Sequence, residues 1–136
     1  GGDEKGRPYG IGRTGTVHRP GLSAGEYAAF VKEKLGSACV RFVDGGRPVQ
    51  RVAVGGGACG SMLEDAVAQG CDTFVTADLK YNQFLDAKAL GLNLLDAGHF
   101  STENVVCAPM ARWLSEEFPM VEVRLSEVHR EVYKSV

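Results

Sequence analysis

Two side chains that can bind a divalent metal ion lie four positions apart in the segment Asp96-Ala-Gly-His-Phe-Ser-Thr-Glu103. The segment follows the mostly apolar run 92–95, where the pattern indicates a change from a buried strand to a helix. If that helix begins near Ser101, His99 and Glu103 project from its entry and first turn toward one point. An imidazole nitrogen and a carboxylate oxygen together suit Zn²⁺, Mn²⁺ or Fe²⁺. The pair is therefore a candidate for part of a metal site.

Two simpler interpretations of the same segment stay open at this stage. A histidine and a glutamate four residues apart also occur by chance, and Glu103 could serve only to complement the positive end of a helix. If the metal interpretation holds, Asp96 is a candidate for the outer carboxylate that orients the imidazole ring.

A second candidate site is the glycine-rich loop 54–61, which lies between an expected strand and an expected helix. Gly55, Gly57 and Gly60 satisfy the pattern G-x-G-x-x-G, and Asp78 follows at about the distance of a ribose-binding carboxylate. A dinucleotide-binding, Rossmann-like domain is therefore one alternative, and a tight turn with close strand-to-helix packing is the other. The residues expected to hold a phosphate on this loop are Gly55, Gly56, Gly57 and Ser61.

The third candidate loop is Thr76-Ala-Asp-Leu-Lys-Tyr-Asn82. Asp78 can be explained as the N-cap of the next helix. Lys80 and Tyr81 are not explained by capping, because they fall in the first helical turn at the same rim of the sheet. Lys80 is the candidate catalytic residue, with the role of neutralising an anionic group of a substrate.

Capping boxes and hydrophobic periodicity predict the elements that position these loops. Ser23–Glu26 and Ser61–Glu64 are capping boxes, so helices are expected from them to Gly36 and to Gly70. Strands that alternate with helices indicate an α/β protein, with a layered sheet that is mostly parallel and has antiparallel edge strands. The other expected helices are 81–90 and 102–118, and the expected strands are 40–43, 51–54, 73–75, 92–95 and 121–125.

The length of 136 residues favours one domain. We expect a disordered polar N-terminus at 1–8 and a single α/β domain at 9–136. The polar, glycine-rich start has no initiator Met, so the chain is expected to be cut from something longer.

Composition excludes several classes of function. Fifteen Lys and Arg stand against 17 Asp and Glu without a block of like charge, so the basic surface of a nucleic-acid-binding protein is missing. No apolar run is long enough to span a membrane and no secretion signal is present, which favours a cytoplasmic protein. Four cysteines lie far apart without a C-x-x-C motif, a pattern typical of reduced and mostly buried thiols.

The motifs Arg51-Val-Ala-Val-Gly-Gly-Gly, Thr76-Ala-Asp-Leu-Lys-Tyr and Asp96-Ala-Gly-His-Phe-Ser-Thr-Glu resemble the C-terminal half of the Nif-three-like proteins (NGG-one-interacting factor three). The resemblance runs from about Tyr9 to Val136, and G-H-x-x-T-E is its most specific element. It implies a dinuclear metal centre, two divalent ions (Zn, Mn or Fe) in each full-length protomer, and assembly into a toroidal hexamer. It also implies that His99 and Glu103 are metal ligands. Some members are named as homologues of a type 2 GTP cyclohydrolase I.

The chain departs from the family pattern in ways that bear on function. The paired histidines and the aspartate that complete the family's metal centre belong to an N-terminal half that this sequence does not contain, and His18 and His129 are expected at the surface. Asn82 stands where relatives often have His, and Ala77 where they have Gly. The sequence therefore suggests part of a metal-dependent hydrolase for a nucleotide or phosphorylated small molecule, with little or no metal held by this chain alone. The alternative is a non-catalytic oligomeric scaffold or partner-binding protein with a structural metal.

Overall fold

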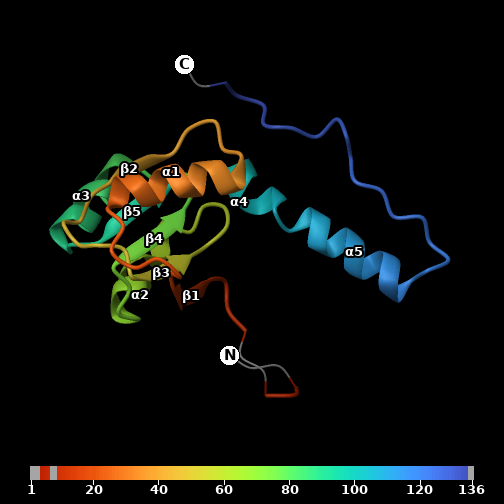
Figure 1. Ribbon diagram of the computed structural model, residues 1–136, viewed down its shortest axis with the longest axis horizontal. Helices are drawn as coiled ribbons and strands as arrows, with labels where there is room; N and C mark the ends of the chain where they lie inside the picture. Colours follow the sequence, from red (N-terminus) through yellow and green to blue (C-terminus); the bar gives the residue numbers. More distant parts are fainter. Residues whose placement is uncertain (1–3, 7–8, 135–136) are drawn as a thin grey trace.

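A computed structural model of the chain describes residues 4–6 and 9–134, so most of the predicted disordered segment 1–8 lies outside the described residues. A five-stranded sheet lies at the centre, in the order β1-β3-β4-β5-β2 (Figure 1). Strands β3, β4 and β5 are parallel, and each edge strand is antiparallel to its neighbour. The predicted α/β class, mostly parallel with antiparallel edges, is confirmed. The strands are β1 (Arg13–Thr16), β2 (Arg41–Val43), β3 (Arg51–Val54), β4 (Thr73–Thr76) and β5 (Asn93–Asp96).

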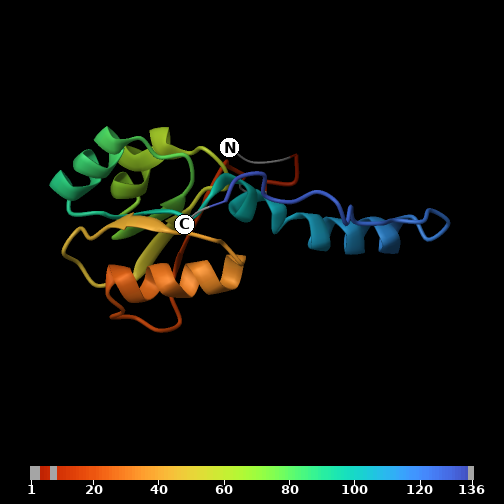
Figure 2. The same ribbon diagram turned by 90° about the horizontal axis from the view of Figure 1, so that it is seen from above.

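Helices cover both faces of the sheet, as Figure 2 shows, with α1 on one face and α2 and α3 on the other. Side chains alternate along each strand, so neighbours belong to different layers. Val75 packs under α1, whereas Phe74 lies in the cluster beneath α2 and α3. The helices are α1 (Ala24–Leu35), α2 (Leu63–Ala68), α3 (Tyr81–Ala89), α4 (His99–Asn104) and α5 (Cys107–Glu117), with a short 3₁₀ turn η1 (Gly60–Met62) before α2.

The first predicted capping box is confirmed and the second is wrong. Ser23 Oγ accepts from Glu26 N at 3.3 Å, and the Glu26 carboxylate accepts from Ser23 N at 2.8 Å. Ser61 lies inside η1 instead, and α2 begins at Leu63 without a side-chain cap. The 3₁₀ turn leaves Ser61 no capping role, because the backbone carbonyl of Cys59 already accepts from Met62 N at 2.9 Å.

The predicted helix 102–118 is two helices, α4 and α5, and the first begins at His99, three residues earlier than expected. Gly98, at φ 86°, turns the chain directly from β5 into α4. The break between the two helices precedes Pro109, which lacks an N–H and clashes with the carbonyl four residues back in a continuous helix. Pro109 is tolerated because it lies in the first turn of α5.

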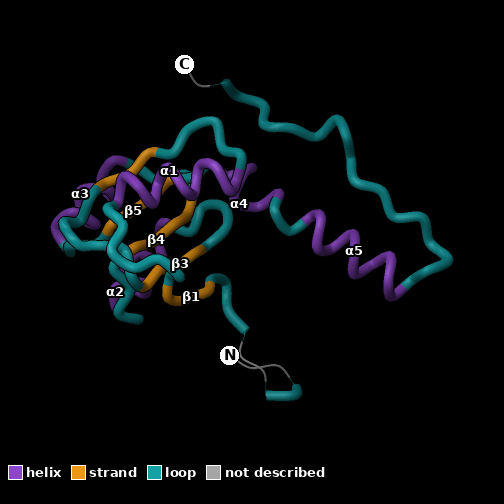
Figure 3. Tube along the Cα trace, in the orientation of Figure 1, coloured by secondary structure: helices purple, strands orange, loops and turns teal. Residues whose placement is uncertain are grey.

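The predicted strand 121–125 is absent from the described chain, although Val121, Val123 and Leu125 alternate with charged residues. This segment follows α5, which extends away from the sheet and buries none of its residues (Figure 1). It returns as an extended loop that forms no strand ladder (Figure 3). An alternating pattern makes a strand only where a sheet edge can pair with it, and no described edge reaches this segment.

The expectation of mostly buried thiols is met by half of the cysteines. Cys59 and Cys71 are buried, and Cys39 and Cys107 are exposed. Across the described ranges, no helix is both long enough and apolar enough to cross a membrane.

Candidate metal centre

The three candidate loops meet at one edge of the sheet because the strands that precede them are parallel. Strands β3, β4 and β5 all end at this edge, with Thr76 directly opposite Asp96. Ligands of parallel α/β sheets bind beyond the carboxyl ends of the strands. The glycine loop, the Asp78 loop and the start of α4 therefore surround a common rim.

His99 lies between two carboxylates at this rim. Its Nδ1 is 2.6 Å from Asp78 Oδ2, and its Nε2 is 3.1 Å from Glu103 Oε2, one helical turn away on α4. The hydrogen bond with Asp78 is the main reason that the pKa of His99 is raised above 6.5. Desolvation lowers this pKa, and the nearby charge of Glu103 raises it. Because each ring nitrogen faces an oxygen acceptor, the ring is held in one orientation.

Asp78 has a different role from the one predicted. The N-cap position of α3 is Lys80, so capping by Asp78 is wrong. Asp78 is the one described non-glycine residue with a positive φ, 54°. In this backbone conformation its carboxylate contacts His99. Such strained positions persist where the surrounding structure fixes them, often at functional sites. The carboxylate is engaged with the imidazole, which argues against the ribose-binding role of the dinucleotide alternative.

Asp96 does not orient the imidazole, contrary to the sequence hypothesis. Its carboxylate accepts from Leu79 N at 3.1 Å and from Gly98 N at 3.2 Å, and it forms an ion pair with Arg41. Arg41 is opposite Asp96 in the antiparallel β2–β5 pair. Asp96 therefore ties the loops after β4 and β5 together, and Asp78 is the residue that orients His99.

The glycine loop passes close to α4 at Gly57, whose positive φ of 67° favours glycine. A Cβ there would collide with the carboxylate of Glu103 and lie 3.2 Å from His99 Nε2. Gly57 N donates to Thr102 Oγ1 at 3.0 Å, which fixes the loop against the helix. Thr102 was not singled out from the sequence, although it belongs to the G-H-x-x-T-E element. The glycines thus provide close approach to the His99–Glu103 pair.

Several N–H groups of the glycine loop already have acceptors within the protein. Gly55 N donates to Val75 O at 2.9 Å, and Cys59 N donates to Thr76 Oγ1 at 3.0 Å, in addition to the bond from Gly57. Ser61 is exposed in η1. The phosphate-binding role of Gly55, Gly56, Gly57 and Ser61 therefore stays a prediction, and bound phosphate would have to displace these bonds.

Lys80 lies at the same rim, two residues after Asp78, and its side chain is exposed. Its backbone N–H donates to Gln83 Oε1 at 2.8 Å, which fixes the first turn of α3. The position suits a cation that meets an anionic group arriving at the rim. His18 and His129 are exposed, as expected, and the ring of His129 lies with its centroid 5.1 Å from that of Phe100, the α4 residue next to His99.

His99 and Glu103 are placed so that both could bind the same divalent ion. Two donors bound to one tetrahedral zinc ion by bonds of about 2.0–2.2 Å lie roughly 3.3 Å apart, and the Nε2–Oε2 distance of 3.1 Å is close to that value. Asp78 contacts the other ring nitrogen and so does not converge on the same point. Within residues 4–6 and 9–134, no group of three or more His, Cys, Asp or Glu side chains is arranged to hold an ion.

Comparison with known proteins gives relatives that match nearly all of this chain. A curated protein of Staphylococcus aureus (strain COL), named GTP cyclohydrolase 1 type 2 homolog, is 32% identical over 132 residues, covering 94% of this chain and 36% of that protein. A Bacillus subtilis (strain 168) protein of the same name is 41% identical over 93 residues, covering 68% of this chain and 25% of that protein. The chain thus spans about a third or less of the length of these relatives.

Solved structures and a family model agree with these relatives. A crystal structure of a Staphylococcus aureus protein matches with a TM-score of 0.81 and 31% identity, covering 94% of this chain and 38% of that one. A Bacillus cereus protein related to NIF3 matches with a TM-score of 0.78 and 28% identity, covering 93% of this chain and 36% of that one. The family model Duf34/NIF3 (NGG1p interacting factor 3) matches residues 4–132. Sequence, fold and the motif around His99 thus lead to one conclusion, that this chain belongs to the Duf34/NIF3 family.

Proposed function

We propose that this chain forms part of a dinuclear divalent-metal centre in a hydrolase that acts on a nucleotide or another phosphorylated small molecule. The observation that carries the proposal is the placement of His99 between Asp78 and Glu103, beside the close approach of Gly57 to α4. The relatives named GTP cyclohydrolase 1 type 2 homolog support a hydrolytic reaction on a nucleotide.

The protein residues prepare the site in three ways. Asp78 accepts a hydrogen bond from His99 Nδ1, which leaves Nε2 as the nitrogen that binds a cation. Glu103 places a carboxylate oxygen beside Nε2 from the next helical turn. Lys80 lies where it can neutralise an anionic substrate group, and the loop at Gly57 closes one side of the rim. Bound divalent ions supply a water of pKa near 7 and polarise the carbon or phosphorus that is attacked.

Two protein donors are fewer than the three or four that zinc sites use. We therefore propose that further ligands come from a polypeptide segment outside this chain. The chain alone is then expected to bind metal weakly, because each missing donor is replaced by water.

Metal content tests this proposal. We expect the chain purified alone to hold much less than one equivalent of zinc, manganese or iron by elemental analysis. When the remainder of the family fold is supplied as a second polypeptide, the content should rise toward two ions per complex. His99→Ala should abolish that rise and any phosphatase or nucleotide hydrolase activity together, and Glu127→Ala, outside the motif, should abolish neither. Full metal content in the His99 variant would refute the proposed ligand.

A non-catalytic oligomeric scaffold with a structural metal is the second candidate function. The uncovered apolar side chains of α5 favour it, because such surfaces mark contacts between proteins. The two candidates differ in one result: a metal-loaded complex that hydrolyses no phosphorylated substrate supports the scaffold.

A further inference from the structure

A cavity of about 940 Å³ lies between α1 and the β1–β3 edge of the sheet. It is on the face that α1 covers, and α1 packs mainly over the opposite half of the sheet, where its cluster includes Val75 and Leu95. The space above β1 and β3 is therefore left open beside the helix. Neither His99 nor Glu103 lines it, so this cavity is separate from the candidate metal centre.

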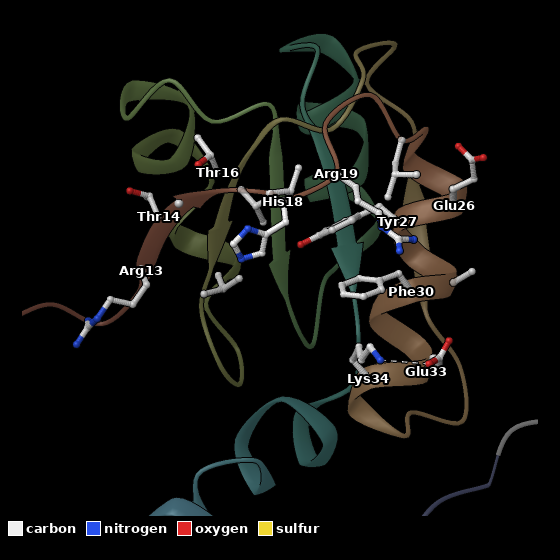
Figure 4. A pocket seen from close by; sticks show the side chains of 16 residues that line it. Arg13, Thr14, Thr16, His18, Arg19, Glu26, Tyr27, Phe30, Glu33 and Lys34 are labelled. Atoms are coloured by element: carbon white, nitrogen blue, oxygen red, sulfur yellow. Dashed lines mark hydrogen bonds and ion pairs between the residues drawn. The ribbon is translucent and has the colours of Figure 1, made fainter.

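The side chain of Tyr27 is mostly buried, and its hydroxyl opens onto this cavity. Tyr27 is 9% exposed, and its backbone N–H donates to Ser23 O at 3.0 Å, but among residues 4–6 and 9–134 its hydroxyl has no hydrogen-bond partner. Every fully enclosed side-chain nitrogen or oxygen of the described chain does have a partner, so the Tyr27 hydroxyl must face open space. Figure 4 shows the side chain reaching from α1 into the cavity, with its hydroxyl toward His18.

Because the hydroxyl is reached from the cavity and has no partner among the described residues, it is available to a molecule that enters the cavity. A ligand acceptor at this point would supply the missing partner. Burial, with a smaller effect from the charge of Asp72, raises the pKa of Tyr27 above 10.0, so the hydroxyl is protonated near neutral pH and acts as a donor. It can therefore donate a hydrogen bond to an acceptor oxygen of a ligand.

Aromatic and apolar side chains form the walls of the cavity. The rings of Tyr27 and Phe30 are stacked with centroids 5.7 Å apart and planes inclined by 29°. His18 lies across from them in Figure 4, and Val52 and Val54 of β3 also line the cavity. Flat apolar molecules stack favourably on such surfaces. The volume is within the range of small-molecule sites, about 300–1,000 Å³.

The charges at the mouth favour an anion. Three basic residues line the cavity, Arg13, Arg19 and Lys34, against two acidic ones, Glu26 and Glu33. Glu26 accepts from Ser23 in the capping box, and Glu33 pairs with Lys34 at 3.3 Å. Arg13 donates to the carbonyls of Gly10 and Gly12, so Arg19 is the cation of this lining without a partner among the described residues.

We propose that this cavity binds a flat aromatic monoanion, with its ring system against Phe30 and His18 and an acceptor oxygen on the hydroxyl of Tyr27. Arg19 supplies the attraction for the negative charge at the mouth. This is a second binding site, independent of the metal centre.

Titration with 2-naphthoate, followed by amide chemical shifts in NMR spectra, tests the site. Saturable shifts are expected at Val17, Phe30 and Val52. Tyr27→Phe should weaken binding by about three- to tenfold, the effect of one lost hydrogen bond. The matched variant Tyr81→Phe removes a hydroxyl that is outside the cavity, on a residue 77% exposed, and should bind like the wild type.

A second variant keeps the test decisive if Tyr27→Phe does not fold. Arg19→Gln, on an exposed residue, should weaken binding of 2-naphthoate but not of the neutral 2-naphthamide. Shifts centred on α5, or equal affinity of the Tyr27 and Arg19 variants and the wild type, would overturn the proposal. So would shifts of the cavity amides on simple dilution without ligand, since another copy of the chain would then fill the cavity.

Discussion

At the scale of single residues, the contact between Asp78 and His99 determines how the rim can act. The sequence identified His99 and Glu103, because both lie in one short motif. It assigned the orienting carboxylate to Asp96, which belongs to the same motif. The structure gives that role to Asp78, which lies 21 residues before His99. Asp78 and His99 meet because β4 and β5 are adjacent and parallel. The spacing of residues within one motif does not show which strands are adjacent.

Replacing Asp78 by Asn should lower the pKa of His99 toward its ordinary value, because the hydrogen bond to Asp78 is the largest cause of the increase. A raised pKa in the folded state stabilises the fold at pH below about 6.5, and this contribution is lost as pH rises through the folded-state pKa. The stability difference between wild type and Asp78→Asn should therefore be larger at pH 5 than at pH 8. An NMR titration of the His99 ring and urea unfolding at both pH values measure these quantities.

Asp86→Asn, on the exposed surface of α3, is the matched control and should leave the His99 titration unchanged. An unaltered pKa of His99 in the Asp78 variant would mean that the contact has little effect in solution.

Gly57→Ala should destabilise the protein by more than its backbone conformation alone explains. Gly36 and Gly57 have similar positive φ values, 60° and 67°, but a Cβ at Gly36 meets nothing within 4 Å. Gly36→Ala should therefore cost about 1–2 kcal/mol for the left-handed backbone. Gly57→Ala should cost more by up to about 1 kcal/mol, because the added Cβ must also push the exposed carboxylate of Glu103 away from His99. Equal losses in urea denaturation would show that this carboxylate moves aside without a measurable cost.

At the scale of elements, local patterns predicted most strands and helices but not every boundary. The strands expected at 40–43 and 92–95 were each found within one residue, because short, mostly apolar runs bounded by turn residues are typical of buried strands. The single helix expected at 102–118 ignored Pro109, and the strand expected at 121–125 has no described partner edge. The pattern of a segment does not show whether a sheet edge is available to pair with it.

The two predicted capping boxes make a direct comparison of local pattern and structure. Ser23→Ala should lower the free energy of unfolding by about 0.5–2 kcal/mol, because its hydroxyl caps α1. Ser61→Ala should change it by less than about 0.5 kcal/mol, because that hydroxyl has no capping bond. Urea unfolding midpoints of the two variants measure the difference, and a larger loss at Ser61 would contradict the assigned start of α2.

At the scale of the whole molecule, α5 is the element that the rest of the chain leaves uncovered. Val106, Met110 and Trp113 recur at helical spacing and are 52%, 50% and 57% exposed. An apolar stripe of this kind normally packs against another surface. We therefore expect the chain to self-associate or to bind the rest of a family fold through α5.

Trp113→Glu should shift the chain toward a monomer of 14.5 kDa in sedimentation velocity, whereas wild type should sediment as a larger species at micromolar concentration. The same charge placed on the opposite side of the helix, by Ser115→Glu, should leave the wild-type distribution unchanged. A monomeric wild-type protein would show that α5 does not mediate self-association.

The central claim, that His99 and Glu103 bind a divalent cation, is tested most directly by Mn²⁺ added to the isotopically labelled chain. Paramagnetic broadening of amide signals detects weak binding, so it does not require the further ligands. We expect broadening centred on α4 and the glycine loop, lost in His99→Ala and retained in His18→Ala, which removes an exposed histidine just after β1, outside the site. Broadening that persists unchanged in His99→Ala, or that centres on Glu116 and Glu117 of α5, would contradict the claim.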